Sequence, residues 1–308
     1  MSFRSVQAAS ANVVWVGGTK GTCLRTTDGG HTWQARPVRG AEMLDFRGLA
    51  VMNSHTAILV SAGQAELGQA RIYRTVDGGE TWDLVFQTPQ KGIFLDGTAF
   101  WDQRHGIVFG DPIDGKWVLL TTADGGVSWQ RIAAEVPVML PKEAAFAASN
   151  SSISVRNKTN VWIASGGSER ARMFYSSDRG LKWKVIETPM PSGATAGIFG
   201  IRFWDSAHGI GVGGDHQRTE EPSDNVILTH DGGRTWQKSA PTDPTGLKEA
   251  VVVLPEGDLL AVGPSGTSLS RDQGRSWQRV DALPLHAAAC AQGRCWAVGG
   301  KGVIARWQ

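Results

Sequence analysis

Short apolar runs recur along the whole chain, and each is followed by glycine or serine. Seven of them share this form: Val13–Val16, Ile58–Val60, Ile107–Phe109, Val161–Ala164, Ile210–Val212, Leu259–Val262 and Trp296–Val298. Apolar runs of this length, bounded by turn residues, are typical of buried β-strands. The pattern predicts an all-β chain in which one kind of inner strand occurs seven times.

A polar motif of the form S/T-x-D-x-G-x-x-W alternates with these runs and occurs six times. Its aspartates are 49, 47, 54, 53 and 41 residues apart, which is the length of a four-stranded propeller blade. The Asp can accept hydrogen bonds from its own turn, the Gly supplies a positive φ, and the Trp begins the next strand. We therefore expect structural hairpins at Asp28, Asp77, Asp124, Asp178, Asp231 and Asp272.

These repeats predict an all-β fold, a single seven-bladed β-propeller of four-stranded antiparallel blades over residues 1–308. The approximate blades are 1–40, 41–89, 90–137, 138–190, 191–241, 242–281 and 282–308. The segment from His286 to Gln308 repeats only the first three strands of a blade. Propellers often close by adding a strand from the opposite terminus. Because only Met1–Phe3 precede the first blade, we expect the closure either to be imperfect or to depend on residues upstream.

Composition narrows the class of protein further. Hydrophobic residues make up 41% of the chain and charged residues 19%, which is enough apolar material for a large core. The net charge of +2 gives the chain no overall positive electrostatic field that would attract nucleic acid, and no apolar stretch reaches membrane-spanning length. We expect a monomer with no membrane insertion. Cys290 and Cys295 flank a short turn and are either bridged or reduced, whereas Cys23 is expected in the core.

The repeated motif resembles the Asp-box, or BNR, repeat of sialidase-like propellers. With six copies and short blades, the chain resembles the photosystem II stability and assembly factor family and its uncharacterised bacterial relatives, also in the segments Asp45–Leu49 and Glu143–Ser149. The resemblance implies an exported propeller that binds proteins during assembly, so a periplasmic or extracellular location is expected. Because Met1–Ser10 lacks the apolar core of a signal peptide, a cytoplasmic location stays open.

Sialidase chemistry is not expected. Those enzymes use a tyrosine nucleophile, and the only tyrosines here, Tyr73 and Tyr175, occupy strand positions that leucine fills in other repeats. No histidine or cysteine spacing indicates a metal, and no motif indicates a cofactor.

A candidate site emerges where the inner strands begin, at the mouth of the channel opposite the Asp-boxes. Alignment of the repeats places mostly charged residues there: Arg4, Arg47, Asp96, Glu143, Phe199, Lys248 or Glu249, and His286. Loops at the same mouth add Asp111 and the stretch Asp215–Glu221, with His216 and Arg218, and Trp117 lies near one of them. Such a ring predicts either a concave binding site or a solvated rim whose charges neutralise one another.

Three functions fit this mouth. The leading hypothesis is a non-catalytic scaffold that binds a protein or peptide, with Arg4 and Arg47 holding a carboxylate or phosphate. The alternative is a glycoside hydrolase or lyase that uses Asp96, Glu143, Asp111 or Asp215 as acid and base on a carbohydrate. Unpaired carboxylates facing one pocket would favour the enzyme, whereas carboxylates paired with Arg4 or Arg47 would favour the scaffold. A purely structural module predicts no pocket.

Overall fold

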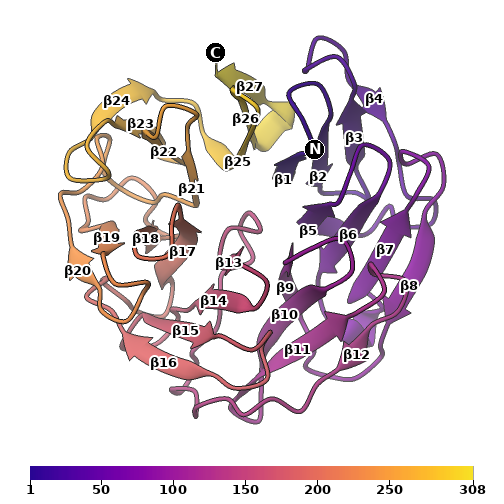
Figure 1. The fold of residues 1–308 in the computed structure, drawn as a ribbon, viewed down its shortest axis with the longest axis horizontal. Coiled ribbons are helices and arrows are strands. Elements are labelled where there is room, and N and C mark those ends of the chain that lie inside the picture. The colour runs from indigo at the N-terminus through magenta and orange to yellow at the C-terminus, as the bar shows by residue number, and fades with distance from the viewer. Residues whose placement is uncertain (308) are drawn as a thin grey trace.

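A computed structural model describes residues 1–307, whose strands form seven antiparallel sheets. The sheets stand around a common axis, with β1, β5, β9, β13, β17, β21 and β25 nearest to it (Figure 1). The predicted seven-bladed β-propeller is confirmed.

The strands of each blade pair in chain order from the axis outwards. Blades 1 and 2 contain β1 (Phe3–Ala8), β2 (Val14–Gly18), β3 (Cys23–Thr26), β4 (Gln34–Ala35), β5 (Asp45–Val51), β6 (Ala57–Ala62), β7 (Arg71–Thr75) and β8 (Asp83–Gln87). Blades 3 and 4 contain β9 (Leu95–Phe100), β10 (Gly106–Ile113), β11 (Lys116–Thr122), β12 (Gln130–Arg131), β13 (Ile153–Arg156), β14 (Asn160–Ala164), β15 (Arg172–Ser176) and β16 (Lys184–Glu187). Blades 5 to 7 contain β17 (Ala196–Phe203), β18 (Gly209–Asp215), β19 (Val226–Thr229), β20 (Gln237–Lys238), β21 (Ala250–Val253), β22 (Leu259–Gly263), β23 (Gly266–Ser270), β24 (Gln278–Asp281), β25 (Leu285–Ala291), β26 (Arg294–Gly299) and β27 (Ile304–Trp307). Two short 3-10 helices, η1 (Ala65–Leu67) and η2 (Gly300–Gly302), lie between strands.

Each Asp-box joins the third and fourth strands of its blade. In blade 2 the Thr75 hydroxyl donates to Asp77 (2.8 Å) and accepts from the Gly79 amide (3.0 Å). Asp77 in turn accepts from the Thr81 amide (3.0 Å) and the Thr81 hydroxyl (2.6 Å). Gly79 has a φ of 85°, a conformation that side chains with a Cβ resist. These bonds, led by the one from the Thr81 hydroxyl, lower the pKa of Asp77 to about 2.

The core lies between neighbouring blades rather than within one sheet. Trp15 is fully buried in blade 1 and meets the Asp-box ring of Trp82 edge to face, with 6.0 Å between ring centroids. Trp129 of blade 3 likewise shares a buried cluster with Ile58 and Ile72 of blade 2. Because burying one such side chain contributes about 1.5–3 kcal/mol, the stacking of blades supplies much of the stability.

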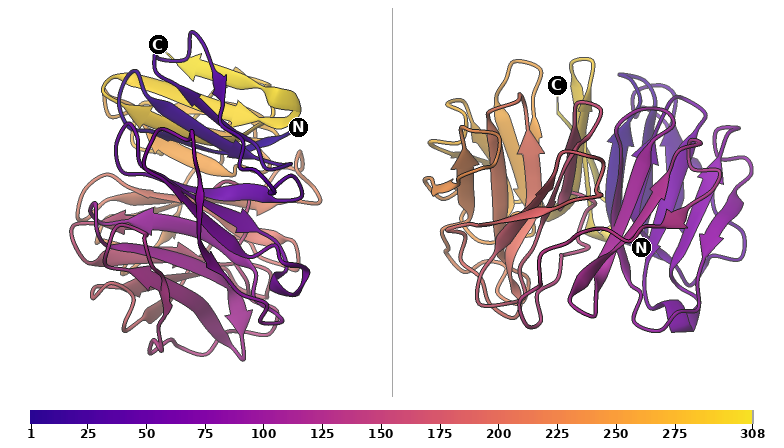
Figure 2. Two further views of the ribbon diagram at one scale, coloured as in Figure 1. Left: turned by 90° about the vertical axis from the view of Figure 1, so that its right-hand side faces the viewer. Right: turned by 60° about the horizontal axis from the view of Figure 1, so that its bottom comes forward.

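Blades 1 and 7 close the ring by packing face to face, as the indigo and yellow strands show in Figure 2. Val14 and Val16 share one buried cluster with Trp296 and Val298, and the Trp296 indole donates to the Gly29 carbonyl (3.2 Å). Blade 7 has three strands within residues 1–307, and β1 pairs with β2 of its own blade.

One connection between blades departs from the repeat. Residues 132–152 separate β12 from β13, and their last part, residues 145–151, reaches other blades. The Asn150 amide group donates to Leu49 O (3.0 Å), and its oxygen accepts from the Thr98 amide (2.8 Å). Ser149 Oγ donates to Glu249 O (3.0 Å). Residues 145–151 thus bridge blades 2, 3 and 6, and we name them the channel plug.

Candidate functional site: the mouth pocket

A pocket of about 330 Å³ lies at the predicted mouth, between the channel plug and the ends of the blades. It is lined by Arg4, Arg47, Phe94, Asp96, Asp111, Ala145, Phe146, Ala147, Ala148, Phe199, His216 and Glu249. A purely structural module would have no pocket at the mouth, so this pocket contradicts that hypothesis. The charged residues come from blades 1, 2, 3 and 6, so the site exists only in the closed ring.

Arg4 belongs to a chain of hydrogen bonds across the joint between blades 1 and 7. Arg4 Nη1 lies 3.1 Å from His286 Nε2, and His286 Nδ1 lies 2.8 Å from Glu249 Oε2. A guanidinium can only donate, so Nε2 must accept, and Nδ1–H donates to the carboxylate. This places the imidazole between a cation and an anion. Burial lowers the pKa of Arg4, and the Glu249 carboxylate opposes that shift.

Arg47 occupies a bulge in β5 and is held on two sides. Its Nε donates to Asp45 Oδ2 (2.8 Å), and its Nη1 donates to the carbonyl of Ala147 in the channel plug (2.8 Å). The arginine therefore connects blade 2 to the plug, and Asp45 balances its charge.

Asp96 and Asp111 lie side by side in blade 3, where Gly110 pairs with Leu95. Asp96 is 1% exposed, and neither Asp96 Oδ2 nor Asp111 Oδ1 has a hydrogen-bond partner within residues 1–307. Burial, and next the Asp111 charge, raise the pKa of Asp96 well above its usual range. Burial likewise raises the pKa of Asp111 to about 6, against the pull of the Ala145 amide.

Aromatic rings form another wall of the pocket. Phe146 of the channel plug stacks on Phe199 of β17 with 4.0 Å between centroids and 4° between planes. His216 meets the edge of this stack, 5.9 Å from Phe146. The pocket therefore combines an acidic wall with a flat apolar one.

In the rest of the predicted loop Asp215–Glu221, the charged side chains pair with one another. Asp215 accepts from Thr195 Oγ1 (2.7 Å) and from Arg218 Nε (3.0 Å), and Arg218 also pairs with Glu221 (3.1 Å). Asp215 and Arg218 lie outside the pocket lining, whereas His216 lies in it.

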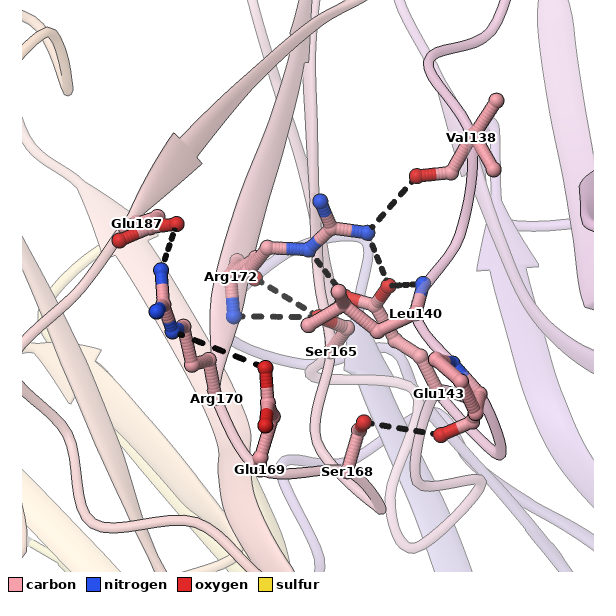
Figure 3. A network of polar contacts seen from close by, with 10 residues as sticks. Val138, Leu140, Glu143, Ser165, Ser168, Glu169, Arg170, Arg172 and Glu187 are labelled. Atoms are coloured by element: carbon pink, nitrogen blue, oxygen red, sulfur yellow. Dashed lines mark hydrogen bonds and ion pairs between the residues drawn. The ribbon is translucent and has the colours of Figure 1, made fainter.

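The predicted placement of Glu143 at the mouth is wrong. The inner strand of blade 4 is β13, which begins ten residues later than Glu143. Glu143 is buried in an ion pair with Arg172 and also accepts from Ser165 Oγ (2.6 Å) and the Leu140 amide (2.8 Å), as Figure 3 shows. The long connection before β13 shifted the alignment of this repeat, and Glu143 fixes that connection to blade 4.

The structure also defines the positions of Lys248, Trp117 and the two cysteines of the predicted turn. Lys248 is fully buried, and its Nζ donates to Ser265 Oγ (2.9 Å), so Glu249 rather than Lys248 reaches the mouth. Trp117, expected near a ligand, is 4% exposed and packs edge to face against Phe109 and Phe174. Cys290 and Cys295 form a disulfide between β25 and β26.

The tyrosines are strand residues, as the repeats indicated. Tyr73 is 5% exposed and meets Phe46 edge to face, and Tyr175 packs on Trp162 with 5.0 Å between centroids. Neither lines the mouth pocket. Within residues 1–307 no group of three or more His, Cys, Asp or Glu side chains is placed to hold a metal ion, and no helix is long and apolar enough to cross a membrane.

Sequence comparison relates the chain to assembly factors of photosynthesis. It is 24% identical over 240 residues to the photosystem II assembly lipoprotein Ycf48 of Synechococcus sp. (strain CC9902), a match that covers 75% of this chain and only 59% of that protein. The Ycf48 lipoprotein of Picosynechococcus is 24% identical over 306 residues, covering 84% of this chain and 80% of its own. The expected resemblance is confirmed. No family model matches the chain.

Structural comparison shows the same likeness in the fold. A solved structure of YCF48 bound to a D1 peptide aligns with a TM-score of 0.72 and 13% identity, over 99% of this chain and 91% of that one. YCF48 from Cyanidioschyzon merolae aligns with a TM-score of 0.67 and 16% identity, over 99% and 95%. The WD40 propeller domain of Doa1 reaches 0.64 at 13% identity, over 100% and 93%. At these identities the likeness concerns the fold alone.

Proposed function

We propose that this chain is a non-catalytic scaffold that binds a segment of a partner protein in the mouth pocket. The observation that carries the proposal is a pocket of about 330 Å³ that combines charges of both signs with exposed parts of aromatic rings. The channel plug, which bonds to blades 2, 3 and 6, forms one wall of this pocket. The assembly role named for the Ycf48 relatives, and the D1 peptide on one of them, support this use of the fold.

One observation favours the carbohydrate enzyme, because Asp96 and Asp111 face a common pocket without an ion pair to Arg4 or Arg47. Hydrolysis, however, requires carboxylates on opposite sides of the scissile bond. Asp96 and Asp111 approach any ligand from the same wall, that of blade 3. Glu143 and Asp215, the other candidate acids, are bound to arginines away from the pocket. Binding without catalysis therefore accounts for more of the geometry.

An extracytoplasmic location, in the periplasm or outside the cell, belongs to the same proposal. The Ycf48 relatives are named lipoproteins, and disulfides persist in oxidising compartments. The bond between Cys290 and Cys295 fits such a compartment. Fractionation of native cells with an antibody to this chain tests the location, and recovery in the cytoplasmic fraction would refute it.

Affinity capture from native extracts tests the binding face. His216→Lys changes an exposed residue in the pocket lining, and Val127→Lys makes a matched change at an exposed Asp-box turn. We expect His216→Lys to lose a partner that both the wild type and Val127→Lys retain. Equal capture by all three proteins, or release of sugars from a glycan array by the wild type, would refute the proposal.

A further inference from the structure

Each cation of the mouth pocket already has at least one acceptor within the protein. Arg4 Nη1 is linked through His286 to Glu249, although Arg4 Nε has no acceptor within residues 1–307, and Arg47 is held by Asp45 and the Ala147 carbonyl. A ligand carboxylate would have to compete with these groups. The arginines are thus poorly placed to be the main attraction for a partner.

The acids of the same pocket lack such partners. Asp96 Oδ2 and Asp111 Oδ1 are buried acceptors without a donor among residues 1–307. Buried carboxylate oxygens without donors are costly, so a ligand that brings donors and positive charge gains most at this wall. We name Asp96 and Asp111 the acid pair.

We infer that the acid pair binds a basic side chain, lysine or arginine, presented by the partner segment. This rests on the proposed function and names the chemistry that the pocket selects. The cationic head donates to Asp111, the half-buried member of the pair, and its positive charge replaces the protons that Asp111 and the 1% exposed Asp96 hold.

The aromatic wall of the pocket suits the rest of such a side chain. Phe146 is half-buried and stacked on the buried Phe199, and its exposed part offers an apolar surface on which the methylene stem of lysine or the plane of arginine can lie. A metal ion fits less well, because no third ionisable ligand is grouped with the pair within the part of the chain described.

The affinity of the acid pair for a basic side chain should depend on pH. Charged and titratable groups around the acid pair are Arg4, Arg47, Asp45, Glu249, His216 and His286. Burial raises the pKa of Asp111 to about 6 and raises that of Asp96 well above its usual range, so protons compete with a cation for the pair. Affinity for a basic ligand should therefore rise as the pH increases through 6.

Titration with small probes tests this directly. N-acetyl-lysine methylamide and N-acetyl-norleucine methylamide, which differ only in the ammonium group, are added to isotope-labelled protein and followed by NMR. We expect only the lysine probe to shift the amide signals of the pocket. Its affinity should fall about tenfold between pH 7.5 and pH 5, and about tenfold in Asp111→Asn, since a charged hydrogen bond is lost.

Asp114→Asn is the matched control, because Asp114 is an exposed acid in the turn between β10 and β11. It should bind the lysine probe as the wild type does. Equal binding of the norleucine probe, an unchanged affinity in Asp111→Asn, or an affinity that does not depend on pH would each overturn the inference. The pH comparison uses the wild type, so it stands even if the variant folds poorly. Partner capture that depends on His216 but not on Asp111 would sink this inference while leaving the proposed function intact.

Discussion

The buried ion pair of blade 4 allows a sharp prediction for stability. The Glu143 side chain is 0% exposed and that of Arg172 is 8% exposed. In Glu143→Ala the guanidinium loses both contacts to the carboxylate and keeps the Val138 carbonyl, 3.1 Å from Nη2. Breaking a buried pair in this way costs about 3–5 kcal/mol, because the remaining charge stays uncompensated. Urea unfolding followed by tryptophan fluorescence measures the loss.

A second arginine and glutamate in blade 4 provide the control. Arg170 and Glu187 also form an ion pair, but their side chains are 53% and 63% exposed. Glu187→Ala should therefore cost only about 0–1 kcal/mol. If the two variants lose similar free energies of unfolding, the argument that Glu143 fixes the connection before β13 is wrong.

Three further predictions concern groups whose ionisation or oxidation the structure defines. Burial raises the folded-state pKa of Asp111 from 3.8 to about 6, so the wild type loses stability as the pH rises between these values. Asp111→Asn should therefore be more stable by up to about 3 kcal/mol near neutral pH and should gain nothing below pH 4. Equal urea midpoints of the two proteins at neutral pH would contradict this. Hydrogen bonds from Thr81 lower the pKa of Asp77 to about 2, so they stabilise the fold above pH 3.8, and this stabilisation is lost as the pH falls towards 2. The free energy of unfolding of Asp77→Asn should therefore depend less on pH in an acid titration. Parallel profiles for the wild type and the variant would refute this. Chemical labelling of the unfolded, unreduced protein should find one thiol, Cys23, because Cys290 and Cys295 are bonded, and three labelled thiols would contradict the bond.

The fold followed from the sequence because its main determinants are local and repeated. Each Asp-box contains within eight residues the hydroxyl, carboxylate and glycine that make its hairpin, as Thr75, Asp77 and Gly79 illustrate. Strands and hairpins that recur every 41 to 54 residues leave little choice of architecture. Closure of the ring by packing of Trp296 against blade 1 was harder to predict from the sequence, because it joins segments from opposite ends of the chain.

The site was predicted only where it obeys the repeat. Arg4, Arg47 and Asp96 were found because they share one position at the start of an inner strand, and each sits in a β-bulge there. The channel plug was missed because residues 145–151 have no counterpart in other blades. The unusual length of the connection before β13 was the available signal. Glu143 was misplaced for the same reason, since its burial depends on Arg172, a partner 29 residues away.

Photo-crosslinking tests most directly whether partners are recognised at the mouth pocket. A benzophenone amino acid replaces either His216 in the pocket lining or Val127 at an Asp-box turn, and the protein is irradiated in native extract. The account predicts a discrete crosslinked partner from position 216 and none from position 127. A partner trapped at position 127 but not at position 216 would contradict it.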